Sequence, residues 1–385
     1  MREPKIYPLD SGGYGFRMDI GKDPKTGKRK RPRFGPYKSK TTARLERNKI
    51  MQQIMEGTFV EQKEMTLKDF LLRWLDHKRV NVSEGTYAHY KPYIMHHWIP
   101  NLGMAKINEV KPVHIQEIYD EYIENEVLSN QSIVHMHRVL NNAFNDAIKW
   151  EWAVRNPCTP IKPPRPEKYE MKVWDEFELQ HFLEFSKGDR FYVAYLLALS
   201  TGMRKGEILA LRWQDIDFSN KLLAVRQAVT RKKGGGYKIG ETKSKNQRTI
   251  SLFNHVLEEL KTYRKQQMSF KMENRDKYED QDLILAANNG SFILPRNLDR
   301  SWRPLMKKSG LKFIRFHDFR HTHATLMLKQ GVHPKVVQER LGHSSITVTL
   351  DLYSHVLPNI QRAAAEQFGD EIFGAKNENK DSIQT

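Results

Sequence analysis

Six side chains in the C-terminal half of the chain have types that fit one reaction, the attack of a tyrosine on a phosphodiester. They are Arg204, Lys243, His317, Arg320, His343 and Tyr353. A tyrosine phenol can displace an alkoxide from phosphorus and stay attached, so the phosphotyrosyl intermediate stores the energy of the broken bond. The transition state gathers negative charge on its non-bridging oxygens. Two guanidiniums stabilise this charge best, because they are permanently charged and form bidentate hydrogen bonds.

The remaining residues of the set would transfer protons or hydrogen-bond the phosphate. A lysine on a turn, Lys243, can protonate the departing 5′ oxygen. His317 and His343 can hydrogen-bond the phosphate or help to move the proton of the tyrosine. Because the arginines supply the electrostatic stabilisation, the reaction requires no metal and no cofactor. Glu207 follows Arg204 by one helical turn, and we expect it to orient that arginine.

Each of these residues also has an ordinary structural interpretation. Arg204 could simply cap a helix, and His317 and Arg320, one helical turn apart, could be a solvated pair. Lys243 has basic neighbours, Lys245 and Arg248, on what could be an ordinary basic loop. A tyrosine near a helix end is usually half-buried packing. No single residue therefore establishes the chemistry.

A zinc site is the competing interpretation of the histidines. The candidate ligands are His317, His321, His323 and His343. The chain offers no useful cysteine and no HExxH motif, so this site has little support. We expect no bound metal, and we expect His321 and His323 to form hydrogen bonds within a helix.

The composition favours a polyanionic partner. The 385 residues carry a formal net charge of +18 and a pI near 9.7. Nucleic acid is the first candidate partner for such a chain, and a basic protein that is merely solvated is the alternative. One cysteine, Cys158, excludes an internal disulfide and fits a reducing cytoplasm. Without a signal peptide or a long apolar segment, we expect a cytoplasmic protein.

Residues 1–60 form the most basic block. The first 50 residues hold fifteen Lys or Arg against five Asp or Glu. Residues 14–20 alternate like a strand, residues 30–34 could be the return strand, and a helix should run from about Ser39 to Met55, closed by Gly57. We expect a small three-stranded sheet with one helix. Its aromatic residues beside many cations would suit DNA contact: Phe16, Phe34 and Tyr37.

Residues 64–156 have apolar positions at helical spacing and predict a self-contained helical domain. Its second helix should end before Pro100. Five prolines then fall between residues 157 and 166. Because prolines at this density cannot continue a helix, residues 157–169 predict a stiff, basic interdomain linker.

Residues 170–370 predict a second large domain, mostly helical, followed by a polar tail over residues 371–385. Asp175 with Glu178 should cap a helix, and residues 191–200 should form a buried one. Residues 221–225 and 237–242 predict strands around the Gly234-Gly235-Gly236 turn, with a third at 248–252. Three antiparallel strands would place Lys243 in the turn between the second and the third.

Taken in order, these segments resemble the tyrosine recombinase family of the phage integrase type. The matching stretches are Thr201-Gly202-Met203-Arg204-Lys205-Gly206-Glu207, Thr242-Lys243-Ser244-Lys245, His317-Asp318-Phe319-Arg320-His321-Thr322, Leu341-Gly342-His343 and Leu350-Asp351-Leu352-Tyr353-Ser354-His355. The ten positions from His343 to Tyr353 fit the family. Met203 and Phe319 stand where the family commonly has leucine, and these apolar exchanges leave the roles of their neighbours intact.

The resemblance implies a multidomain α+β fold and an integrase of a phage or other mobile element. It implies a catalytic domain at 170–370, a helical SAM-like core-binding domain at 64–156 and an arm-type DNA-binding domain at 1–60. Such enzymes act as tetramers on double-stranded DNA with core and arm sites. They form a 3′-phosphotyrosyl intermediate and exchange strands through a Holliday junction. An excisionase and a host DNA-bending protein are the usual partners.

Two alternatives remain open at this level. One is a DNA-binding regulator that keeps the fold without catalysis, against which the intact set of six residues argues. The other is a type IB topoisomerase-like enzyme, which uses the same covalent chemistry without partner sites. The basic block at residues 1–60 favours the integrase over the topoisomerase.

Overall fold

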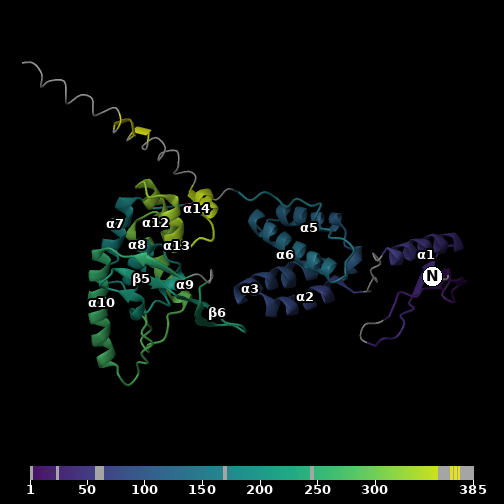
Figure 1. The fold of residues 1–385 in the computed structure, drawn as a ribbon, viewed down its shortest axis with the longest axis horizontal. Helices are drawn as coiled ribbons and strands as arrows, with labels where there is room; N and C mark the ends of the chain where they lie inside the picture. The colour runs from purple at the N-terminus through teal and green to yellow at the C-terminus, as the bar shows by residue number, and fades with distance from the viewer. Residues whose placement is uncertain are drawn as a thin grey trace, which may run out of the picture. The chain divides into compact units, whose positions relative to one another are not determined.

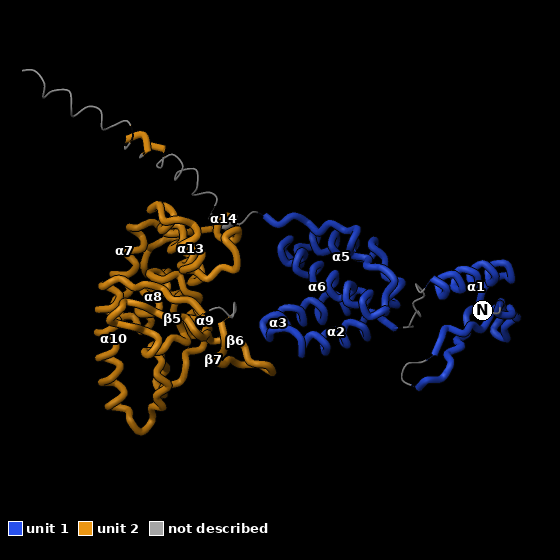
Figure 2. Tube along the Cα trace, viewed as in Figure 1, with its two compact units in different colours: residues 1–167 blue, residues 168–385 orange. Residues whose placement is uncertain are grey.

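The computed structural model describes most of the chain. The described residues are 3–22, 26–56, 65–167, 171–242, 247–353, 365–366, 368–370 and 372. The backbone divides into two compact units, residues 1–167 and 168–385, which Figure 2 shows in different colours. Figure 1 labels the helices and strands.

The basic N-terminal block folds as a three-stranded antiparallel sheet with one helix, which confirms the expected architecture. The strands are β1 (Ile6–Pro8), β2 (Tyr14–Arg17) and β3 (Arg33–Tyr37), in that order across the sheet. Helix α1 (Lys40–Met55) begins at Ser39, whose hydroxyl accepts a hydrogen bond from the backbone N–H of Thr42. The expected closing residue of the helix, Gly57, lies outside the described residues.

One aromatic residue of this block was assigned the wrong role. Phe16 is fully buried and packs with Met18 and Ile50. Its ring stacks on Phe34 at 5.3 Å and on Tyr37 at 5.9 Å between centroids. A block this small needs a large apolar side chain in its core, and Phe16 fills that place, so it is unavailable to DNA.

The helical part of the first unit has its own core. Its helices are α2 (Leu67–Asn81), α3 (Glu84–Tyr93), α4 (Ile99–Leu102), a 3₁₀ turn (Ile107–Glu109), α5 (Pro112–Glu124) and α6 (Asn130–Lys149). The predicted helix end before Pro100 is wrong. A π-helical turn (Ile94–Trp98) joins α3 to α4, and Pro100 lies in the first turn of α4, where a missing N–H costs nothing.

The proline-rich segment starts inside this core. Cys158 and Ile161 are buried in it, and burial raises the pKa of the Cys158 thiol. Cys158 is thus a packing residue. The boundary between the two compact units falls further along, between residues 167 and 168.

The strands of the second unit pair differently from the prediction. A three-stranded antiparallel sheet contains β4 (Ile216–Asp217), β5 (Leu222–Val225) and β8 (Arg248–Ser251). Strand β7 (Tyr237–Glu241) instead pairs with β6 (Gln227–Arg231) in a separate hairpin. The glycine turn at 234–236 is too tight to reach β5, so the strand directly before it becomes the partner. Lys243 follows β7 and lies outside the described residues.

Helices make up the remainder of the second unit. They are α7 (Glu176–Phe185), α8 (Tyr192–Thr201), α9 (Lys205–Ile208), α10 (Asn254–Glu273), α11 (Pro295–Ser309), α12 (Asp318–Lys329), α13 (Pro334–Leu341) and α14 (Ile346–Tyr353). Asp175 and Glu178 form the expected capping box at the start of α7. A cluster of aromatic rings fills the core, and Phe319 packs in it against Trp174 and Trp302. This packing fixes the start of α12, where Arg320 lies.

Candidate active site

A left-handed glycine places the first arginine of the site. Helix α8 ends at Thr201, and Gly202 follows with φ +65°. A Cβ at this position would lie 2.5 Å from Leu341 Cδ2 and 2.8 Å from a carbon of the His323 ring. Only glycine therefore fits the turn, which brings Arg204 to the start of α9.

Glu207 orients Arg204, as expected from the sequence. The Glu207 carboxylate accepts hydrogen bonds from Arg204 N at 2.9 Å and from Arg204 Nη1 at 3.0 Å. Arg204 Nη2 donates to the carbonyl oxygen of Gly342 at 3.3 Å. The Arg204 side chain remains 28% exposed, so its guanidinium is accessible to a bound anion.

A second arginine, Arg248, holds the other side of the same carboxylate. Its Nη1 and Nη2 donate to the two Glu207 oxygens at 3.1 and 2.7 Å. Burial of Glu207 raises its pKa, but the hydrogen bonds and charges of Arg248 and Arg204 outweigh burial and lower the pKa overall. The sequence interpretation treated Arg248 as a basic-loop residue. The available signal was its alternation with Ile250, which puts an arginine on the inward face of a strand.

Arg320 lies deep in the second unit. It is 3% exposed, and its Nη1 donates to the carbonyl oxygen of Gly202 at 2.8 Å. His317 directly precedes the same helix, α12, and its ring lies 5.4 Å from that of His321. Burial, then the neighbouring His321 and Arg320, lowers the pKa of His317 to about 4. His317 is therefore neutral at pH 7.

His343 lies in the turn between helices α13 and α14. Its Nδ1 lies 2.9 Å from Thr349 Oγ1. Burial, followed by the charges of Arg320 and Arg204, lowers the pKa of His343 to about 4. The hydrogen bond from Arg204 to Gly342 O, one residue before His343, places Arg204 beside this segment. With Nδ1 engaged, Nε2 is the nitrogen that could reach a phosphate. Tyr353 is the last residue of α14, one helical turn after Thr349, and its side chain lies outside the described part of the structure.

The structure thus gathers four of the six expected residues and the backbone of a fifth. Arg204, Arg320, His317 and His343 come together from three separate segments, and Tyr353 ends the adjoining helix. Among the described residues, no group of three His, Cys, Asp or Glu side chains is placed to hold a metal ion.

The expectation that His323 bonds within its own helix is wrong. Its Nδ1–H donates to the carbonyl oxygen of Leu199 in α8 at 2.8 Å, and its Nε2 accepts from Arg340 Nε in α13 at 3.0 Å. Helix α12 packs directly on α8 and α13, so a side chain on its buried face meets other helices.

The free energy of unfolding should fall below pH 6.5, and His323 should contribute to the loss. Burial, then the charge of Arg340, lowers its folded-state pKa to about 4 from an unfolded value of 6.5. The unfolded chain therefore binds the extra proton between these pH values, and the folded state loses about 2 kcal/mol from this group between pH 7.5 and 5. Urea unfolding of wild type and of His323→Gln at about pH 7.5 and about pH 5 measures this loss of unfolding free energy. A pH dependence equal in the two proteins would contradict the assignment.

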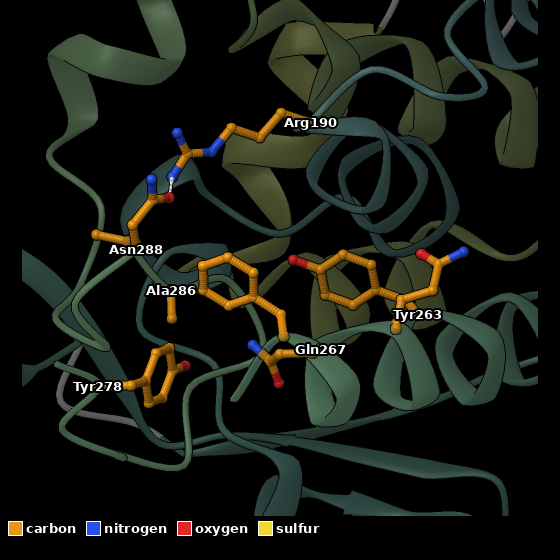
Figure 3. A pocket seen from close by; sticks show the side chains of 9 residues that line it. Arg190, Tyr263, Gln267, Tyr278, Ala286 and Asn288 are labelled. Carbon is orange, nitrogen blue, oxygen red and sulfur yellow. Dashed lines mark hydrogen bonds between the residues drawn. The ribbon is translucent and has the colours of Figure 1, made fainter. Parts of the chain in front are cut away.

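A pocket of about 200 Å³ lies away from this cluster, beside α10 (Figure 3). Aromatic and amide side chains line it, and Arg190 Nη2 donates to Asn288 Oδ1 at its edge at 2.9 Å. None of the six expected residues contributes to its wall, so the pocket plays no part in the site. No helix within the described residues is long and apolar enough to span a membrane.

Known families and structures match the chain over most of its length. Residues 172–359 match the phage integrase family, and residues 66–123 match the N-terminal SAM-like domain of phage integrases. A "Tyrosine recombinase XerC-like" of Caldanaerobacter subterraneus subsp. tengcongensis is 31% identical, with 93% of this chain and 96% of that protein covered. The ICEBs1 integrase of Bacillus subtilis is 28% identical, with 95% and 99% covered.

Two solved structures share the fold. The Tn1549 transposon integrase in complex with transposon right end DNA has a TM-score of 0.66 at 24% identity, over 79% of this chain and all of that one. A lambda integrase tetramer bound to a Holliday junction has a TM-score of 0.58 at 19% identity, over 91% and 95% of the two chains.

These matches and the clustered arginines and histidines define a DNA-cleaving and DNA-rejoining enzyme. The chain belongs to the phage integrase family of tyrosine recombinases, and it is an integrase of the mobile-element type. The regulator and topoisomerase alternatives are thereby disfavoured. The fold class expected from the sequence, a multidomain α+β chain with a mostly helical catalytic domain, is confirmed.

Proposed function

We propose that Tyr353 is the nucleophile of a site-specific recombinase that integrates and excises a phage or other mobile element. One observation carries this assignment. Hydrogen bonds bring Arg204, Arg320, His317 and His343 together beside the helix that Tyr353 ends. Two guanidiniums and two neutral imidazoles at one place suit a phosphate under attack.

In the proposed reaction, the Tyr353 oxygen bonds to the scissile phosphorus and the bond from phosphorus to the 5′ oxygen breaks. The products are a 3′-phosphotyrosyl linkage and a free 5′ hydroxyl. Lys243 gives the proton to the departing 5′ oxygen. Arg204 and Arg320 neutralise the non-bridging oxygens of the transition state. A 5′ hydroxyl from the partner strand then attacks the linkage and releases the tyrosine, so no bond energy is lost to water.

The two histidines suit this reaction because burial keeps them neutral. With a pKa of about 4, His317 and His343 each present one N–H and one lone pair at pH 7. A neutral imidazole can accept the phenol proton or donate to a phosphate oxygen. The bound phosphate would raise both pKa values, because it places negative charge beside them.

We further propose the partners of this reaction. The substrate is double-stranded DNA with core-type and arm-type attachment sites, bound by a homotetramer, in the cytoplasm of a bacterial host where that DNA lies. Residues 170–370 would be catalytic, residues 64–156 would bind core sites and residues 1–60 would bind arm sites. An excisionase and a host DNA-bending protein would set whether the enzyme integrates or excises the element. The net charge of +18 supports the DNA contacts, and binding should weaken steeply with salt.

Covalent trapping tests the proposed function. A core-site duplex with a nick just 3′ of the scissile phosphate loses a short fragment after cleavage, so the 5′ hydroxyl needed for religation diffuses away. We expect wild-type protein to accumulate a covalent protein–DNA adduct, and peptide mapping to find the nucleotide on Tyr353. Absence of any adduct on a validated attachment site, or a nucleotide on another residue, would remove the assignment.

Deleting residues 1–60 should spare cleavage of a core site and weaken integration. The block has its own core of Phe16, Met18 and Ile50, separate from the core of the helical part. Its removal takes away a large excess of positive charge and leaves the active-site residues intact. Suicide cleavage and an integration assay on full attachment sites, run side by side, measure the two effects. Integration at the wild-type level would exclude the arm-binding role.

A further inference from the structure

Arg340 in α13 joins three neighbouring elements of the second unit through one guanidinium. Its Nη2 donates to the carbonyl oxygen of Ser200 at 2.9 Å, and its Nη1 donates to that of Ser251 at 3.1 Å. Its Nε donates to His323 Nε2 at 3.0 Å. Helix α13 is therefore tied to the end of α8, the end of β8 and the middle of α12.

His323 and Arg340 together cap the C-terminus of α8. The last carbonyls of a helix have no partner within it and carry partial negative charge. Here Leu199 O accepts from His323 and Ser200 O accepts from Arg340. Two residues later, Gly202 O accepts from Arg320. The helix end that leads into Arg204 is thus held by side chains from α12 and α13.

The backbone of Arg340 belongs to the same network. Its carbonyl oxygen accepts from Arg248 Nε at 2.9 Å, and Arg248 in turn holds both oxygens of Glu207. Glu207 orients Arg204, whose Nη2 returns to the carbonyl oxygen of Gly342. The segment carrying Arg204 and the segment carrying His343 are therefore linked in a closed ring of hydrogen bonds through Arg340.

We propose that Arg340 and His323 are positioning residues for cleavage, which hold Arg204 and His343 in register without touching DNA. The proposal rests on the proposed function of that site. His323 must be neutral and protonated at Nδ1, because Nε2 accepts from a guanidinium. Lysine cannot replace Arg340, because one ammonium cannot reach three acceptors in the directions that a planar guanidinium spans.

Single-turnover cleavage of the nicked core site tests this with Arg340→Lys, Arg340→Met, His323→Gln and His323→Phe. We expect the rate constant to fall about 100-fold in both Arg340 variants, the effect of a misplaced reacting group. The fraction of enzyme that reacts should stay at the wild-type level. His323→Gln, which keeps a donor and an acceptor, should be closer to wild type than His323→Phe. Lys335→Met, an exposed position on the same helix, serves as the control.

The double variant Arg204→Ala/Arg340→Met decides whether Arg340 acts through Arg204. If it does, the double variant loses less than the product of the two single defects, because one of the two residues to be positioned is already absent. Multiplied defects, or a reduced reacting fraction with a normal rate constant, would overturn the proposal. Weaker DNA binding with a normal rate at saturation would also overturn it and make Arg340 a DNA contact. Failure of wild type to form adduct would reject the proposed function instead.

Discussion

Tyr353→Phe is expected to abolish the covalent adduct while leaving DNA binding intact. The change removes only the phenolic oxygen and keeps the aromatic ring, and no other atom of the side chain can bond to phosphorus. On the nicked substrate, wild type should accumulate adduct and the variant should show none. Mobility shift of the intact core site should be unchanged, since the arginines that meet the phosphate remain.

A matched control separates the nucleophile from a general effect of losing a hydroxyl. Tyr278 lies in the wall of the pocket beside α10, away from the proposed site, and burial there raises its pKa to about 12 (Figure 3). Tyr278→Phe should form adduct at the wild-type rate. Adduct from Tyr353→Phe at that same rate would show that another residue attacks the phosphate.

Arg320→Ala is expected to lower the single-turnover cleavage rate by roughly 100-fold or more, and Arg204→Ala similarly, because each removes a charge that meets the transition state. Arg320 is buried and its Nη1 already bonds Gly202 O, so its loss also loosens the turn that carries Arg204. We therefore expect the larger effect at Arg320. Arg204 is partly exposed, and its removal leaves Arg248 still bonded to Glu207.

Rate constants at saturating DNA, with the reacting fraction measured in the same experiment, distinguish lost catalysis from lost folding. Arg303→Ala, an exposed position on α11, is the control and should cleave at the wild-type rate. Near-normal rate constants in both Arg204→Ala and Arg320→Ala would exclude the guanidiniums from charge stabilisation.

The sequence predicted most of the local structure because local signals determine it. The pair Asp175 and Glu178 predicted the start of α7, and the structure contains this capping box. The N-terminal sheet and helix followed from alternation, turn residues and Ser39. One error came from a local rule that has an exception. The helix did not end before Pro100, because a π-helical turn joins α3 to α4 and Pro100 lies in the first turn of α4.

Strand pairing and buried partners were decided only by the tertiary structure. Periodicity locates a strand, but it does not choose between β5 and β6 as the partner of β7, because the choice depends on the reach of the glycine turn. Likewise, Phe16 among cations could serve a surface or a core, and burial settles it.

By itself, the ordered set of arginines, histidines and tyrosine determined the chemistry to expect, because side-chain type limits what a group can do to a phosphate. The tertiary structure decided what holds those groups in place. Arg340 and His323 carry no local signature of that role, since each bonds to residues far away in the chain. A buried guanidinium satisfies its donors wherever the fold brings carbonyls and carboxylates together, and that meeting is a property of three-dimensional packing.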